Sequence, residues 1–226
     1  MSRTFKLGVL AAAVMAVAPA AQAFEAGDFI LRAGVVHVAP DDSSDPLVVT
    51  GFGPLDGKHL LAGTEVGVDA NTQLGIRATY MFTDSLGLGV LGATPFKHDI
   101  KGESSLSGAG KLGETKHLPP TITLQYFPMP SSSKFQPYAG VGVNYTTFFE
   151  EKTVLGELDL DDSVGVAVEF GVDYMLSEQF GLNAAVWWAD INTDAQVTLA
   201  DGVTKTDKFE VEIDPMVYMV GFTYKF

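Results

Sequence analysis

Four histidines and a complete lack of cysteine limit the metal and nucleophilic chemistry that this chain could support. His98 and His117 could meet across one polar segment, but no third ligand stands at the spacing of a metal site. The other two, His37 and His59, lie elsewhere among expected strand ends and loops. Without cysteine there are no disulfides, thiolate ligands or cysteine nucleophile. The sequence therefore predicts no metal site and no cofactor.

Three serines, Ser104, Ser105 and Ser107, lie between His98 and His117 in a Gly-rich segment. A hydrolase that modifies lipids inside a membrane needs a serine, a histidine and an orienting acid on lipid-accessible strand positions. Loop serines do not meet this requirement, so we assign no catalytic residue and expect the protein not to be an enzyme. A lipid-modifying hydrolase stays open as an alternative.

Five charged residues sit within alternating apolar segments, on the face opposite to the apolar side chains: Arg32, Arg77, Glu169, Asp173 and Lys225. Successive side chains of a strand point to opposite faces, so in a closed barrel these residues would face the lumen. If the amino terminus is periplasmic, Glu169 lies nearer mid-height and the other four lie in the periplasmic half. We expect a salt-bridge plug here rather than a ligand site.

The elements that must position these residues are strands of about ten residues with one continuous apolar face. The carboxy-terminal run is the clearest, with large apolar residues at every second position: Met216, Tyr218, Val220, Phe222, Tyr224 and Phe226. Seven further segments alternate in the same way: 28–38, 71–82, 86–93, 118–127, 135–149, 164–174 and 180–188. The sequence thus predicts eight strands.

The connections between these strands alternate in length. Long polar segments follow the first, third, fifth and seventh strands: 39–70, 94–117, 150–162 and 193–210. The third of them could include a helical turn. This asymmetry predicts an all-β fold, an eight-stranded antiparallel up-and-down transmembrane barrel with long extracellular loops and short periplasmic turns. A soluble ligand-binding barrel such as a lipocalin would instead bury Arg32 and Arg77 in a dry pocket, which is costly.

The amino terminus is typical of a secretory signal. Arg3 and Lys6 precede the apolar stretch Leu7–Val17 and a small-residue cleavage site at Ala21-Gln22-Ala23. We expect residues 1–23 to be removed, leaving a barrel of residues 24–226. Export and the barrel pattern together predict a multi-pass protein of the bacterial outer membrane, in contact with the lipid bilayer.

The net charge and the carboxy-terminal residue indicate which classes of partner to expect. Without Arg3 and Lys6, 12 of the 14 basic residues remain against 28 acidic ones, a formal charge of about −16. Nucleic-acid binding requires a basic surface and is not expected. The terminal Phe226 resembles the signature read by the outer-membrane assembly machinery, which is the expected partner during insertion.

Several runs of the mature chain resemble one known family. They are Phe29–Gly34, Asn71–Gly75, Ala93–His98, His117–Thr121, Lys134–Tyr138 and Gly142–Phe149. These runs and the aromatic end are similar to the outer-membrane protein W (OmpW) family, which includes AlkL-like hydrophobe-uptake barrels. The resemblance covers essentially the whole mature chain. The first and third long loops fit less well, so extracellular specificity is not carried over.

The resemblance implies a hydrophobic lumenal pocket for the passage of small apolar molecules, lined by an inward leucine on the third strand and an inward tryptophan on the seventh. The matching positions are Leu91 and Trp187, which strand alternation independently places inside. Strand direction puts Ile191 and Val217 at a similar, outer level. Ordinary filling of a narrow lumen remains the alternative, because eight strands enclose little space.

Prolines stand at the outer ends of the third and fourth strands, at Pro95, Pro119 and Pro120. Proline cannot donate to a strand ladder, so these residues would either open a side window into lipid or simply end the pairing above the membrane. We therefore expect a barrel that passes small hydrophobic solutes, with lateral exit into the bilayer. A structural, adhesin or receptor barrel that acts through its acidic outer loops is the alternative.

Overall fold

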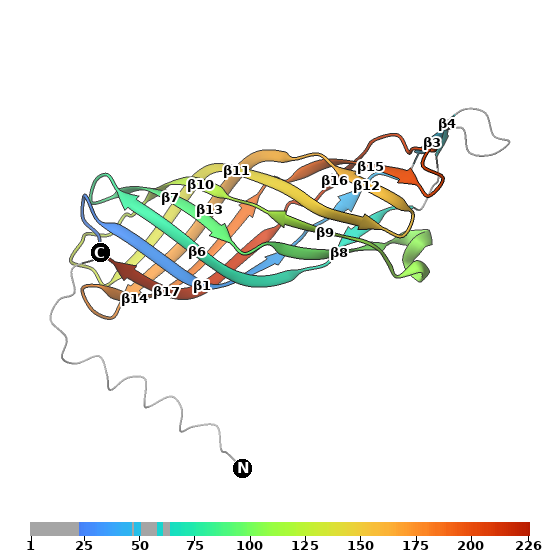
Figure 1. The fold of residues 1–226 in the computed structure, drawn as a ribbon. Coiled ribbons are helices and arrows are strands. Elements are labelled where there is room, and N and C mark those ends of the chain that lie inside the picture. Colours follow the sequence, from blue (N-terminus) through green and yellow to red (C-terminus); the bar gives the residue numbers. More distant parts are fainter. Residues whose placement is uncertain (1–22, 47, 51–57, 61–63) are drawn as a thin grey trace, which may run out of the picture.

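The structure is a computed structural model that describes residues 23–46, 48–50, 58–60 and 64–226 (Figure 1). Eight long strands form its antiparallel barrel: β1 Phe29–Ala39, β6 Asn71–Met81, β7 Leu86–Ala93, β10 Thr121–Tyr126, β11 Phe135–Thr153, β13 Ser163–Met175, β14 Phe180–Ala189 and β17 Met216–Lys225. The predicted signal peptide lies almost entirely outside the described residues. No helix in the described ranges is long and apolar enough to cross a membrane.

The ring of strands closes without an edge. Each strand pairs with its neighbours in the order β10-β7-β6-β1-β17-β14-β13-β11, and β10 pairs with β11 to complete the circle. The carboxy-terminal strand β17 therefore lies beside β1, with Val35 opposite Val220. A closed barrel satisfies the backbone hydrogen bonds of every strand within the protein, as the bilayer interior requires. The predicted eight-stranded barrel is confirmed.

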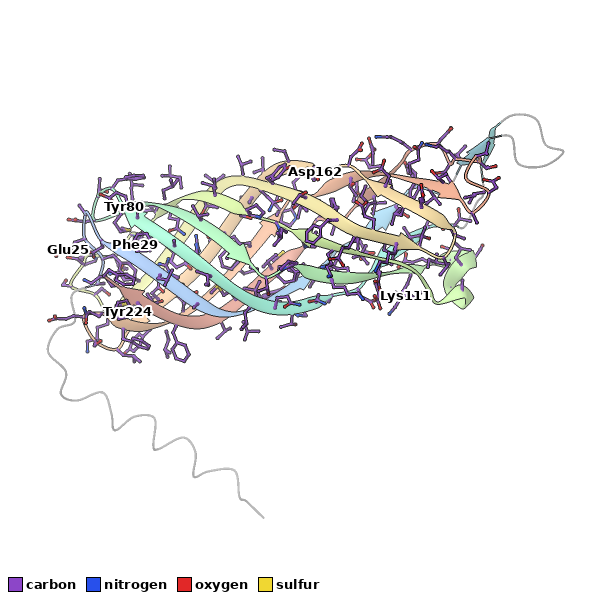
Figure 2. All side chains as sticks on the ribbon, viewed as in Figure 1. Glu25, Phe29, Tyr80, Lys111, Asp162 and Tyr224 are labelled. Atoms are coloured by element: carbon purple, nitrogen blue, oxygen red, sulfur yellow. The ribbon has the colours of Figure 1, made fainter. Side chains whose placement is uncertain are left out.

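The alternating faces also follow the prediction. Apolar side chains at the predicted outward positions are exposed, with Val220 67% accessible and Leu74 68% accessible. Figure 2 shows Phe29, Tyr80 and Tyr224 gathered near the end that carries the short turns. Outward aromatic residues at the edge of an apolar band are typical of membrane-spanning barrels.

All four predicted long loops are wrong in their secondary structure, because each contains strand among its described residues. Much of these segments is strand that lengthens the barrel beyond the apolar band: β2 Ser43–Ser44, β5 Val66–Val68, β8 Phe96–Gly102, β9 Lys111–Leu118, β12 Gly156–Leu160, β15 Asn192–Leu199 and β16 Phe209–Glu212. A further short hairpin joins β3 Val48–Thr50 to β4 Lys58–Leu60. The outward residues of the extension are charged, with Lys97 and Lys116 as examples. Because of these polar residues, the sequence pattern indicates loops, although the backbone forms paired strands as it does within the apolar band.

The expected helical turn at 150–162 is also wrong. This segment continues β11 and turns through Val154 and Leu155 into β12. The helical turn of the structure is the 3₁₀ helix η1, Ser104–Ala109, at the tip of the β8–β9 hairpin. Ser104, Ser105 and Ser107 are exposed on it.

Two predicted strands are interrupted. The segment 118–127 splits into the end of β9 and the whole of β10, with Pro119 and Pro120 between them. The carboxy-terminal strand, expected to begin at residue 211 directly after the fourth long segment, splits between β16 and β17 near Asp214, which has a positive φ of 33°, and Pro215. In both places a proline removes a ladder donor, and the strand resumes beyond it.

Candidate functional site

A layer of buried charge crosses the lumen in the half that carries the short turns. The Arg32 guanidinium donates from Nη2 to Asp173 Oδ2 at 2.7 Å and from Nε to Oδ1 at 3.0 Å. The side chains of both residues are completely buried. Arg32 also donates from Nη1 to Thr79 Oγ1 at 2.8 Å. A fork-to-fork arginine–carboxylate pair of this kind is well suited to a dry interior.

A second buried pair lies beside the first. Arg77 pairs with Glu169, whose Oε1 also accepts hydrogen bonds from Thr123 Oγ1 at 2.7 Å and from Gln125 Nε2 at 2.8 Å. Two arginines and two carboxylates balance, so the layer as a whole is neutral. Buried charges of this kind persist because each is paired and hydrogen-bonded.

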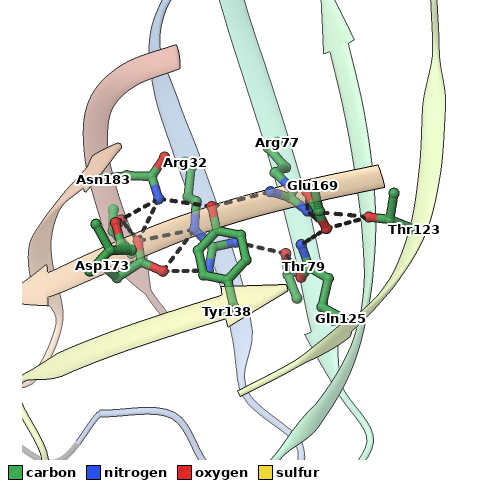
Figure 3. Close-up of polar contacts among 11 residues, drawn as sticks. Arg32, Arg77, Thr79, Thr123, Gln125, Tyr138, Glu169, Asp173 and Asn183 are labelled. Atoms are coloured by element: carbon green, nitrogen blue, oxygen red, sulfur yellow. Dashed lines mark hydrogen bonds and ion pairs between the residues drawn. The ribbon is translucent and has the colours of Figure 1, made fainter. Parts of the chain in front are cut away.

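Tyr138 joins the two pairs (Figure 3). Its ring lies between the two guanidinium groups, 4.9 Å from Arg32 Cζ and 5.2 Å from Arg77 Cζ. Its hydroxyl oxygen accepts from Arg77 Nη1 at 3.2 Å and from Asn183 Nδ2 at 3.0 Å. The ring therefore fills the centre of the lumen and makes one continuous network out of two ion pairs.

Inward glycines make room for these large side chains. A Cβ at Gly140 would overlap the Glu169 carboxylate, and one at Gly171 would overlap the ring of Tyr138. The structure thus brings together four of the five charged residues predicted for the plug. Lys225 does not join them, since its Nζ donates to the Ala23 carbonyl at 2.6 Å and lies 3.5 Å from Asp28 Oδ2.

An apolar pocket, called the lower pocket below, adjoins the charged layer on the side away from the short turns. It has a volume of about 30 Å³, and its walls include all four residues predicted for a lumenal pocket: Leu91, Trp187, Ile191 and Val217. The Trp187 ring lies 5.1 Å from Arg77 Cζ, so the charged layer adjoins the floor of this lower pocket. Val36, Val38 and Phe96 complete much of the apolar lining.

The wall of the lower pocket has an interruption in its strand ladder. Pairing of β7 with β10 ends at Leu91 opposite Thr121, and pairing of β8 with β9 begins at Phe96 opposite His117. Residues 92–95 and 118–120 between these rungs form no registered pairs across this seam. Gly92 and Pro119 line the pocket at this seam. Pro95 and Pro120 flank it without lining the pocket.

A second cavity lies above the lower pocket, inside the strand extension. This upper chamber has a volume of about 70 Å³ and almost entirely apolar walls, among them Ile100, Phe148, Val197, Phe209 and Ile213. The sequence did not reveal it, because the strands that enclose it were interpreted as loops. The sequence does contain one indication of these strands. On β8 and β9, the inward residues His98 and His117 alternate with outward lysines.

His117 lines both cavities, and its ring stacks on that of His98 with centroids 4.7 Å apart. Burial, together with a smaller effect of the neighbouring His98 imidazole, lowers the pKa of His117 to about 3. Burial also lowers the pKa of His98, although the main-chain carbonyl of Asp69 acts in the opposite direction. Both rings are therefore neutral at neutral pH, and His117 lies between the two cavities.

The chain resembles known outer-membrane proteins along its length. The OmpW family profile matches residues 25–226. Outer membrane protein W of Vibrio cholerae is 44% identical over 224 residues, which cover 95% of this chain and 96% of that protein. The crystal structure of OprG from Pseudomonas aeruginosa superposes with a TM-score of 0.82 at 45% identity and covers 91% of this chain and 98% of OprG. The structure of AlkL in lipid bilayers gives a TM-score of 0.65 at 25% identity, with 93% and 94% covered.

Proposed function

Because this chain belongs to the OmpW family of outer-membrane barrels, we propose that it carries small hydrophobic molecules from the outside into the outer membrane. The solute enters the upper chamber, passes His117 into the lower pocket and leaves sideways through the interrupted seam between β7–β8 and β9–β10. The extended end of the barrel faces outwards in this scheme, and the short turns face the periplasm.

The observation that carries this proposal is the position of the lower pocket between a sealed floor and an interrupted wall. Below it, the network of Arg32, Arg77, Tyr138, Glu169 and Asp173 fills the lumen. A solute that crossed this layer would have to separate both buried ion pairs, which costs several kcal/mol. Beside the pocket, no ladder hydrogen bond would have to break between residues 92–95 and residues 118–120, because these two segments form no registered pairs with each other. Exit through the seam therefore costs less free energy than passage through the charged layer.

The apolar walls define the class of solute. Transfer of apolar surface from water to such walls is favourable by roughly 25 cal/mol per Å². A volume of about 30 Å³ holds little more than two waters, so a solute must displace side chains or open the seam as it enters. A Cβ at Gly92 would meet no other atom within 4 Å, so the seam is loosely packed at this residue.

The first test is uptake of a small hydrocarbon by cells that carry Leu91→Asp or Trp187→Asp at matched barrel levels. Both changes place a charge in the lower pocket and should block uptake while the barrel folds. Val203→Asp is the matched control, because Val203 is 82% exposed and lies away from the pocket. Uptake that is unchanged in both pocket variants would remove the proposal. It would favour an adhesin or structural barrel, whereas a hydrolase would lose turnover instead of uptake.

The second test addresses the exit. Cysteines at Gly92 and Pro119, joined by a short bifunctional reagent, should trap solute in the lumen and stop uptake. Cysteines at Val90 and Ile122 are the control, since these residues already face each other across an intact rung. If the cross-link at 92 and 119 leaves uptake unchanged, the solute does not leave through this seam.

A further inference from the structure

Each of the two cavities is lined by a residue whose buried ring nitrogen has no hydrogen-bond partner among the described residues. For the lower pocket this nitrogen is Nε1 of Trp187, and for the upper chamber it is Nε2 of His98. Their side chains are 2% and 1% exposed. Buried polar groups are almost always paired in folded proteins, so two unpaired nitrogens along one apolar route require an explanation.

The two nitrogens differ in what they can bind. The indole Nε1 of Trp187 carries a hydrogen and can only donate. In His98 the other ring nitrogen, Nδ1, contacts the main-chain carbonyl oxygen of Asp69, which can only accept. Nδ1 therefore carries the proton, and Nε2 presents a lone pair that accepts. Burial lowers the pKa of this histidine, so the ring stays neutral and Nε2 remains an acceptor at neutral pH.

A hydroxyl is the simplest group that serves both nitrogens, because it donates through its hydrogen and accepts through its oxygen. A hydrocarbon leaves both nitrogens unpaired. A ketone or ester pairs with Trp187 but has nothing to donate to His98. We propose that this lumen selects small apolar molecules that carry one hydroxyl group, such as alcohols and phenols. The hydroxyl donates to His98 Nε2 in the upper chamber and accepts from Trp187 Nε1 in the lower pocket.

This inference rests on the proposed function and adds a substrate class to it. Another polar side chain of the lower pocket, Asn144, already has partners within the protein. Asn144 Nδ2 already donates to Thr121 Oγ1 at 2.9 Å, and Asn144 Oδ1 accepts from Thr146 Oγ1 at 2.7 Å. The Asn144 and Thr121 side chains of this pocket are thus already paired, whereas Nε1 of Trp187 is a donor that is not used.

The test compares p-cresol with p-xylene, which differ by a hydroxyl in place of a methyl group. Binding is measured by titration calorimetry on the full barrel in detergent micelles. Partition into micelles cancels when the cresol-to-xylene affinity ratio is compared between variants. Trp187→Phe should lower this ratio roughly three- to tenfold, the usual contribution of one hydrogen bond, with little effect on xylene. His98→Phe should lower it by a similar factor.

The neighbouring tryptophan is the matched control. Trp188 is half-buried and does not line the pocket, so Trp188→Phe should leave the ratio unchanged. The chain has two tryptophans, so two indole N–H resonances can be assigned from these two variants. In the wild-type protein the Trp187 N–H resonance should move downfield with p-cresol and not with p-xylene.

The outcomes distinguish a failure of this inference from a failure of the proposed function on which it rests. Equal ratios in wild type, Trp187→Phe and His98→Phe would overturn the hydroxyl preference and leave passage of hydrophobic solutes intact. The same response of the Trp187 N–H to both ligands, as a nitrogen held by water would show, would also overturn it. Failure of both ligands to bind would instead count against the proposed function.

Discussion

Removal of Asp173 tests whether the charged layer is as dry as the geometry indicates. Asp173 accepts hydrogen bonds from Arg32, from Asn183 Nδ2 at 3.0 Å and from Thr223 Oγ1. Asp173→Ala leaves the fully buried Arg32 with Thr79 and the faces of aromatic rings as its remaining contacts. An unpaired buried charge of this kind destabilises a protein by about 3–5 kcal/mol.

The double change Arg32→Met with Asp173→Leu should recover most of that loss. It removes both charges and fills their space, and exchanges of this type are often neutral or stabilising. Asp161→Ala is the matched control because it breaks an exposed pair with Lys208, where both side chains are about half accessible. That change should cost at most about 1 kcal/mol.

The measurement is urea unfolding of the barrel in lipid vesicles, followed by tryptophan fluorescence. A loss below about 1 kcal/mol for Asp173→Ala would mean that water reaches Arg32, which contradicts the buried layer. A double variant as unstable as the single one would mean that the contacts of Arg32 with Thr79 and Tyr138, rather than its charge balance, hold the layer together.

Three further predictions test other regions of the barrel. Burial lowers the pKa of His117 to about 3 from an unfolded value near 6.5. The strand extension should therefore lose stability as the pH falls from 6.5 towards 3, and its stability should stay constant above pH 7. Hydrogen exchange in β8 and β9 measures this stability, and a profile that does not change with pH refutes the prediction. Gly171→Ala should displace the ring of Tyr138 and lower stability by about 1–3 kcal/mol in urea unfolding, and no change would mean that the ring has room to move. Deletion of Phe226, which is exposed on the outward face, should reduce insertion yield much more than Lys225→Ala, and equal yields would argue against recognition of the aromatic end.

The number of strands and the direction of their side chains follow from local pattern alone. A strand alternates its faces with period two, so each outward apolar series identifies its inward partners without knowledge of the neighbouring strands. Val217 and Leu91 could therefore be placed inside the lumen from the sequence. The strand extension was missed because its outward residues are polar, and the contrast between its faces is weak over seven or eight residues.

Which inward residues meet was decided only by the tertiary structure. Arg32 and Asp173 are 141 residues apart, and Arg77 and Glu169 are 92 apart, so their pairing depends on the register between strands and on barrel closure. The position of Tyr138 between both arginines and the upper chamber above His117 depend on the same stagger. Alternation assigns a face to each residue, but its height in the lumen relative to other strands is set by ladder hydrogen bonds around the whole ring.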